Sequence, residues 1–191
     1  MTKRHTRPIA FIVFAVVICI SVVLDRITKH LAALHLQDGA IQPFIPGVLD
    51  FRLVYNIGAA WGILQGAQTV FIIVASFTLV AMVIYLAVNR RHAAGEVIAL
   101  GLIAGGAIGN GIDRALGGQV VDFIHPLFIN FPLFNLADSA ITIGAILFIL
   151  TLLIGYKKAK PAPQPDSHND KDVTPSDAGD NPPKAQDDAP A

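Results

Sequence analysis

The chain has few charged residues and a single cysteine. Only 15% of its 191 residues are charged, against about a quarter in soluble domains, and 53% are hydrophobic. This balance favours a membrane protein, and a formal net charge of zero gives no reason to expect nucleic-acid binding. Cys19 lies in an apolar run and can form no intramolecular disulfide. One cysteine with scattered histidines predicts no metal site, and nothing else in the sequence points to a bound cofactor.

Four long apolar segments account for most of the hydrophobic residues. Ile9–Leu24 and Thr69–Val88 contain no charge, and about 20 such residues cross the ~30 Å of bilayer hydrocarbon. A basic start before an apolar run also describes a secretory signal peptide, but no small-residue cleavage site follows and three further apolar segments do. We therefore predict a membrane all-α fold, with transmembrane helices at about 9–34, 69–88, 97–114 and 133–156.

Lysine and arginine are distributed unevenly between the two sides of this arrangement. Up to Lys160, the side with the termini carries eight: Lys3, Arg4, Arg7, Arg90, Arg91, Lys157, Lys158 and Lys160. The opposite side carries four: Arg26, Lys29, Arg52 and Arg114. Cytoplasmic segments are enriched in these residues, so both termini should be cytoplasmic.

Two segments outside the helices differ in kind. Between the first two helices, Leu49, Phe51, Leu53 and Tyr55 alternate with their neighbours at a period of two. This pattern predicts a strand in a small extracytoplasmic β segment, at about 40–62, that rests on the outer leaflet. Residues 1–158 would form the membrane domain. Residues 159–191 are rich in Pro, Asp and Ala, which predicts a disordered cytoplasmic tail.

Glycine and acidic residues concentrate near the third helix. Gly101, Gly105 and Gly109 form a row of small residues that lets another helix approach closely. Only seven acidic residues precede the tail: Asp25, Asp38, Asp50, Glu96, Asp113, Asp122 and Asp138. Ionisable groups beside a bilayer core cost several kcal/mol unless paired or wetted, so these carboxylates are functional candidates.

Polar residues at the outer helix ends have helical spacing and can converge: Asn110 with Asp113 and Arg114, Asn135 with Asp138, and Asp25 with Lys29. Asn135 is a predicted N-cap of the last helix, whose positive end would favour ionised Asp138. Asp25 and Lys29 are also interpretable as an interfacial ion pair that ends a helix. The histidines at 30, 35 and 125 fit an interface better than a ligand set.

Two carboxylates that share a site can act as general base and general acid, because only one ionises cheaply. Peptide hydrolysis then needs neither a nucleophile nor a metal, and no Ser–His or Cys–His arrangement competes here. The residues alone do not determine which two carboxylates form the pair, although Asp113, on the same helical face as Asn110, looks like the natural partner of Asp138. The alternatives to a peptidase are a transporter or proton-relay subunit and a non-catalytic assembly factor. Clustering of the polar groups at one membrane face favours surface chemistry over a relay.

Five motifs occur in the order of a known family. They are Asp25-Arg26-Ile27-Thr28-Lys29, Asn56-Ile57-Gly58-Ala59-Ala60-Trp61, Gly105-Gly106-Ala107-Ile108-Gly109-Asn110 running to Asp113-Arg114, Val120-Val121-Asp122-Phe123, and Phe134-Asn135-Leu136-Ala137-Asp138-Ser139-Ala140-Ile141. Over about residues 9–156 the chain resembles lipoprotein signal peptidase (signal peptidase II). The only departure is Trp61, where phenylalanine is common.

The resemblance implies an aspartic endopeptidase of the bacterial cytoplasmic (inner) membrane, with its active site at the extracytoplasmic face among membrane lipids. It implies a catalytic pair of Asp122 and Asp138. Supporting roles are implied for Asp25, Lys29, Asn56, Asn110, Asp113, Arg114 and Asn135. The implied substrates are prolipoproteins with a diacylglyceryl-cysteine, cut just before the lipobox cysteine, and globomycin-type inhibitors are expected to bind. Residues 115–131 are a candidate lid, and the segment with Asn56 and Trp61 a candidate substrate clamp.

Overall fold

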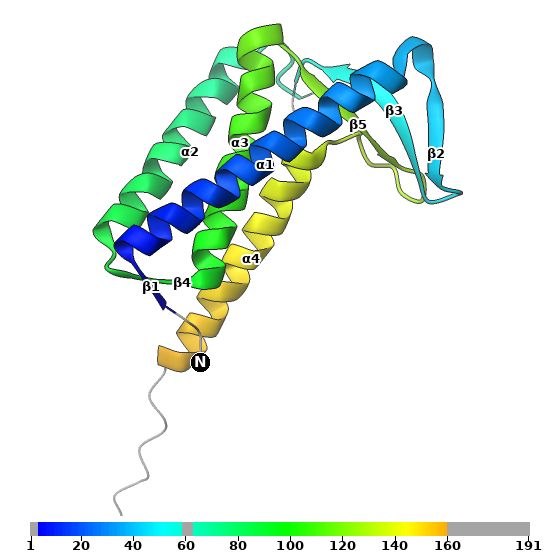
Figure 1. The fold of residues 1–191 in the computed structure, drawn as a ribbon. Helices are drawn as coiled ribbons and strands as arrows, with labels where there is room; N and C mark the ends of the chain where they lie inside the picture. The colour runs from blue at the N-terminus through cyan, green and yellow to red at the C-terminus, as the bar shows by residue number, and fades with distance from the viewer. Residues whose placement is uncertain (1–3, 59–62, 160–191) are drawn as a thin grey trace, which may run out of the picture. The chain divides into compact units, whose positions relative to one another are not determined.

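The computed structural model describes residues 4–58 and 63–159 of the chain. Within these ranges four helices are long and apolar enough to cross a membrane: α1 (Arg7–His35), α2 (Gln68–Val88), α3 (Ala94–Gly117) and α4 (Leu136–Ala159). The prediction of four transmembrane helices is confirmed, and Figure 1 shows them side by side. Trp61, with its expected clamp, and the expected disordered tail beyond Ala159 lie outside the described residues.

Helix α3 is the centre of the bundle. Half of its apolar span is buried, against 17% or less in the other three helices, and it packs against each of them. A Cβ added at Gly101 would lie 2.8 Å from Val17 of α1, and one added at Gly105 would collide with Ser21. The predicted close approach along the glycine row is therefore confirmed. Helix α3 ends at Gly117 because Gly118 adopts a φ of 68°, which glycine reaches at little cost.

Buried apolar side chains form two clusters at opposite ends of α1. The first, where α1 begins, joins α1, α2 and α3 through Ala10, Phe14, Met82, Leu86, Val97, Leu100 and Ala104. The second, where α1 ends, packs Ala32 and Leu36 against Phe123. The second cluster attaches a small sheet to the bundle.

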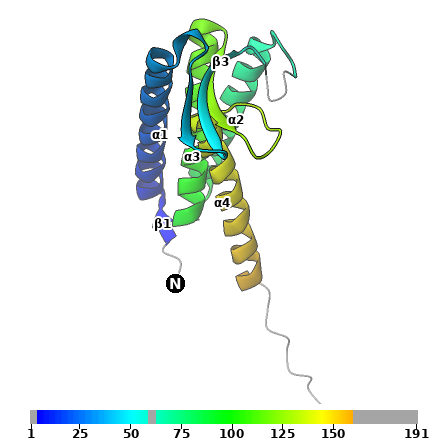
Figure 2. The ribbon, with the colours of Figure 1, turned by 90° about the vertical axis from the view of Figure 1, so that its right-hand side faces the viewer.

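This sheet has three antiparallel strands in the order β2-β3-β5: β2 (Ile41–Ile45), β3 (Leu49–Asn56) and β5 (Val120–Pro126). Strand β3 confirms the strand that was predicted from the alternation of residues 49–55. Figures 1 and 2 show the sheet beside the end of the bundle where α1 ends and α4 begins. A shorter pair, β1 (Arg4–Thr6) with β4 (Arg91–Ala93), lies at the other end and was not predicted.

Strand β5 lies inside the segment 115–131 that sequence reasoning treats as a loop and candidate lid. Its residues pair with β3 from Leu49 to Asn56, so this part of the segment is a strand of the sheet. Apolar residues occur on both faces of β5, and Phe123 on one face packs against α1. The strand therefore lacks the alternation of apolar and polar residues that identifies a half-exposed strand.

Helix α4 begins at Leu136, three residues later than predicted. The reason is that Phe134 still exchanges backbone hydrogen bonds with Ile124 of β5, at 2.9 and 3.1 Å. The chain therefore stays extended up to Asn135, and β5 and α4 meet where their two aspartates lie.

Candidate active site

Asp122 projects from the middle of β5 and is almost fully buried, with 3% of its surface exposed. Each of its carboxylate oxygens accepts a hydrogen bond from an asparagine side chain. Asn56 Nδ2 of β3 donates to Oδ2 at 2.9 Å, and Asn135 Nδ2 donates to Oδ1 at 2.6 Å. Burial raises the pKa of Asp122 to about 6, and the nearby Asp138 adds to this rise, while the two asparagines oppose it.

Asp138 lies in the first turn of α4, where it forms a reciprocal cap with Asn135. Asn135 Oδ1 accepts from the backbone N–H of Asp138 at 3.0 Å, and Asp138 Oδ2 accepts from the backbone N–H of Asn135 at 3.1 Å. The predicted N-cap is confirmed, and it has the geometry of a capping box. The remaining oxygen of Asp138 accepts from Asn110 Nδ2 of α3 at 2.8 Å.

Asn135 joins the two carboxylates and is itself fully buried. Its amide nitrogen donates to Asp122 and to Asn110 Oδ1, while its amide oxygen accepts from the backbone of Asp138. Both aspartates line one cavity of about 410 Å³, with Asn56, Phe131 and Ile143 among its other walls. The structure thus places Asp122 and Asp138 in one site.

Asp113, the partner that the residues alone favour, belongs to a different cluster. Lys29 Nζ lies 2.8 Å from Asp25 Oδ2 and 2.8 Å from Asp113 Oδ2, and Arg26 also pairs with Asp113. The same Lys29 nitrogen donates to Asn110 Oδ1 at 2.8 Å. In this charge cluster, Asp25, Lys29 and Asp113 are buried next to the carboxylate site, whereas the Arg26 side chain is 43% exposed.

The cluster fixes the orientation of the Asn110 amide. Its oxygen accepts from both Lys29 and Asn135, so its nitrogen must face Asp138. Asp25 Oδ1 in turn accepts from the backbone N–H of Ala137 at 3.1 Å. The charge cluster therefore holds the first turn of α4 as well as the amide.

Arg114 does not contact either carboxylate directly. It donates to the carbonyl oxygen of Gly58 at 3.2 Å, and its guanidinium stacks 4.5 Å from the ring centre of Phe71. Asn56 Oδ1 accepts from the backbone N–H of the same Gly58 at 2.9 Å. Arg114 and Asn56 thus hold the segment that follows β3 next to the site.

Two sets of polar contacts were not predicted from the sequence, that of Arg26 and that of Asp50. Arg26 pairs with Asp113, and its signal was a charge beside Asp25 in an otherwise apolar helix. On the sheet, Asp50 accepts hydrogen bonds from Arg52 and contacts His125 Nδ1 at 3.0 Å. The bond from Arg52 lowers the pKa of Asp50. Cross-strand pairing of β3 with β5 creates the His125 contact, so no local pattern indicates it.

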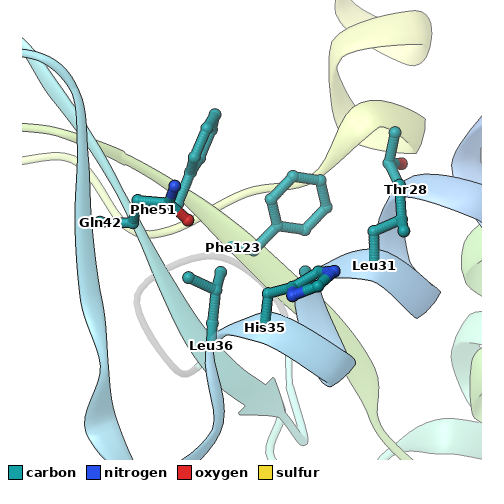
Figure 3. A pocket seen from close by; sticks show the side chains of 8 residues that line it. Thr28, Leu31, His35, Leu36, Gln42, Phe51 and Phe123 are labelled. Atoms are coloured by element: carbon teal, nitrogen blue, oxygen red, sulfur yellow. The ribbon is translucent and has the colours of Figure 1, made fainter.

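A second cavity, of about 550 Å³, lies between the C-terminal end of α1 and the sheet. Figure 3 shows Phe51 and Phe123 from the sheet facing Leu31 and His35 from α1. Successive side chains of a strand point to opposite faces, so Phe123 faces this cavity while Asp122 faces the other. His35 therefore lines the cavity without the aspartates. Among residues 4–58 and 63–159, no three His, Cys, Asp or Glu side chains converge as metal ligands would.

Two solved structures, each described as a bacterial membrane enzyme, share this fold. One has a TM-score of 0.72 and 36% identity and covers 85% of this chain and 98% of its own. The other has a TM-score of 0.67 and 38% identity and covers 80% of this chain and 97% of its own. The fold and the site together define a multi-pass membrane enzyme.

The sequence model of the signal peptidase (SPase) II family matches residues 17–154. A lipoprotein signal peptidase of Halalkalibacterium halodurans is 38% identical over 78% of this chain and 96% of its own length. One of Staphylococcus aureus (strain MRSA252) is 40% identical over 75% of this chain and 90% of its own. The chain belongs to the signal peptidase II family and is a membrane peptidase, which confirms the resemblance seen in its motifs.

Proposed function

We propose that the protein is an aspartic endopeptidase that removes the signal peptide from diacylglyceryl-modified prolipoproteins, just before the lipobox cysteine. One observation carries the mechanism: a single buried asparagine, Asn135, holds Asp122 and Asp138 at one cavity. Paired carboxylates can hydrolyse a peptide bond by activating water directly. The relatives named lipoprotein signal peptidases support the substrate class.

The two aspartates differ in surroundings, which assigns them different roles. Both aspartates accept two N–H donors, but only Asp138 lies at the N-terminus of a helix, where the helix dipole favours negative charge. Asp122 is buried on a strand, and its raised pKa of about 6 means that it keeps a proton to a higher pH than an exposed aspartate does. Asp138 is then the general base and Asp122 the general acid.

In this mechanism a water molecule gives its proton to Asp138 as its oxygen bonds to the scissile carbonyl carbon. Asp122 donates its proton to the carbonyl oxygen, giving a neutral tetrahedral diol. As the C–N bond breaks, Asp138 gives its proton to the nitrogen of the modified cysteine, which leaves as an amine. Asp122 takes a proton from one diol hydroxyl, so the carboxyl product forms and both aspartates return to their starting states. Lys29 takes no part in these transfers. It positions Asn110, and through it Asp138, while Asp25 and Asp113 balance its charge.

The position of the site agrees with a lipid-anchored substrate. Asp138 begins a membrane-spanning helix, so the site lies at the depth where that helix meets the bilayer surface. A diacylglyceryl group in the same bilayer would keep the scissile bond at this depth. The Lys and Arg bias supports an orientation with this face outside the bacterial cytoplasmic membrane and both termini inside.

Cleavage of a diacylglyceryl-modified prolipoprotein by the purified protein tests the proposal. We expect Asp122→Asn and Asp138→Asn each to abolish detectable cleavage, since a general acid or base contributes about 10²–10⁴-fold. Globomycin binding should persist and report a folded site, and wild-type cleavage should survive a metal chelator. Asp113→Asn, which alters only the charge cluster, should keep part of the activity.

Near-normal cleavage by either Asp122→Asn or Asp138→Asn would contradict the assigned pair. Loss of wild-type activity in chelator would instead indicate a metal-dependent mechanism.

A further inference from the structure

Two apolar segments without a single charge meet at the end of the sheet farthest from α1. They are residues 43–49 (PFIPGVL) and residues 127–134 (LFINFPLF). The backbone N–H of Leu127 donates to the carbonyl oxygen of Val48 at 2.8 Å, and Leu49 pairs with Pro126. Residues 44–48 and 127–129 therefore form one continuous surface, which we call the apolar tip.

The side chains of the apolar tip point away from the protein. Phe44 is 62% exposed and Phe128 66% exposed, while Ile45, Val48, Leu127 and Ile129 are each between 40% and 49% exposed. Contiguous exposed apolar surface of this kind marks a contact with another molecule or with a membrane. The peptidase mechanism uses none of these residues.

The bilayer is the partner that the position of the tip favours. Figure 1 shows the sheet lying beside the bundle rather than continuing beyond the helix ends. From the tip, residues 131–134 continue along a cavity wall to Ile143 of α4, and Ile143 and Ile146 are exposed on a membrane-spanning helix. Apolar side chains from Phe131 to Phe134 therefore lie between the exposed side of α4 and Phe128, along the cavity that Asp122 and Asp138 also line.

We propose that the apolar tip inserts into the hydrocarbon edge of the adjacent bilayer leaflet and anchors the sheet there. Aromatic and aliphatic side chains on a polar-backed element enter the boundary between headgroups and acyl chains in this way. Strand β5 runs from the tip back to Asp122 within five residues. The anchor thereby sets the depth of Asp122 against a substrate held by its own lipid. The insertion follows from the fold and the exposed surface, and it stands whether or not the proposed cleavage is correct.

Nitroxide labels on single cysteines test the insertion without measuring cleavage. In a Cys19→Ser background, Phe44→Cys and Phe128→Cys report on the tip in phospholipid vesicles. Phe77→Cys, on the exposed side of α2, is the lipid reference, and Ala40→Cys, exposed just before β2, is the water reference. Collision rates with oxygen and with a water-soluble nickel chelate measure the depth of each label.

We expect the oxygen-to-nickel ratio at both tip positions to be several-fold higher than at Ala40 and to approach that at Phe77. A ratio equal to that at Ala40 would place the tip in water and overturn the proposal. Spin–spin broadening at Phe128 that survives dilution into excess lipid would also overturn it, because a second copy would then cover the tip. Ile45→Cys and Ile129→Cys replace any tip variant that fails to fold.

Discussion

At the scale of single residues, Asn135 holds the carboxylates of Asp122 and Asp138 in position next to each other. One amide caps α4, binds Asp122 and touches Asn110, so it connects a helix end, a strand and a second helix. Each aspartate oxygen accepts one N–H donor, and all the side-chain donors are asparagines. Neutral donors satisfy the carboxylates without forcing both to ionise, so one proton can remain in the site.

The pH dependence of stability checks the protonation of Asp122. Its pKa of about 6 lies above the ~3.9 of an exposed aspartate, so between pH 4 and 6 the folded protein binds more protons than the unfolded protein. The free energy of unfolding therefore falls as the pH rises through this window, by about 3 kcal/mol in total from Asp122. Thermal unfolding of wild type should show this fall, and Asp122→Asn should reduce it.

Asp50→Asn is the matched control for that measurement. The pKa of Asp50 is lowered by Arg52, so its contribution is present above pH ~4 and lost below it. The slope between pH 4 and 6 should then match wild type. An equal slope in Asp122→Asn and wild type would show that Asp122 is already ionised across the window.

At the scale of elements, the contact between α3 and α4 positions Asp138. A Cβ at Gly106 would collide with the carbonyl oxygen of Ala137, the residue before Asp138. The N–H of Ala137 is also held by Asp25. Glycine on α3 thus lets the first turn of α4 sit against the buried charge cluster, which brings Asp138 within reach of Asn110.

Gly106→Ala should therefore both destabilise the protein and lower cleavage. Overpacking a tight contact costs about 1–3 kcal/mol, and here the displaced group is the backbone beside Asp138. Gly111→Ala, on the same helix, meets nothing within 4 Å and should be neutral or stabilising, because alanine favours a helix by about 1 kcal/mol over glycine. Thermal unfolding and cleavage assays compare the pair, and similar losses in both would contradict the packing argument.

At the scale of the whole molecule, the site lies at one end of the bundle and the larger apolar core at the other. The cluster around Phe14 and Leu86 joins three helices where α1 begins, far along the chain from the aspartates. Most side chains on α1, α2 and α4 face outward and are apolar. The bilayer covers those surfaces, so buried polar contacts and close glycine packing decide how the helices associate.

Reporter fusions check the orientation that the charge bias predicts. A fluorescent protein fused after Ala191 should fluoresce, because it folds in the cytoplasm, and alkaline phosphatase fused there should be inactive. A phosphatase fused after Gly66, between α1 and α2, should be active outside. The reverse pattern would place the cavity of Asp122 and Asp138 on the cytoplasmic side and contradict the predicted orientation.

Local patterns account for much of the fold. Apolar runs predicted the four helices because the hydrocarbon thickness sets their length. Alternation predicted β3, and the residue types at 135 and 138 predicted the cap of α4. Strand β5 was missed because apolar residues occupy both of its faces and the hydrophobic alternation is absent. The late start of α4 was missed because Phe134 pairs with that strand.

By itself, the sequence determined the membrane spans, one strand, the helix cap and, through its motifs, the peptidase family. Only the tertiary structure decided how Asp122 and Asp138 are joined through asparagines, what Lys29 holds and where the apolar tip forms. The hydrogen bonds concerned join residues 28, 66 and 81 positions apart: Asn110 to Asp138, Asn56 to Asp122, and Lys29 to Asn110. Hydropathy and periodicity act over one helix or strand, whereas these contacts exist only once the helices and the sheet have packed together.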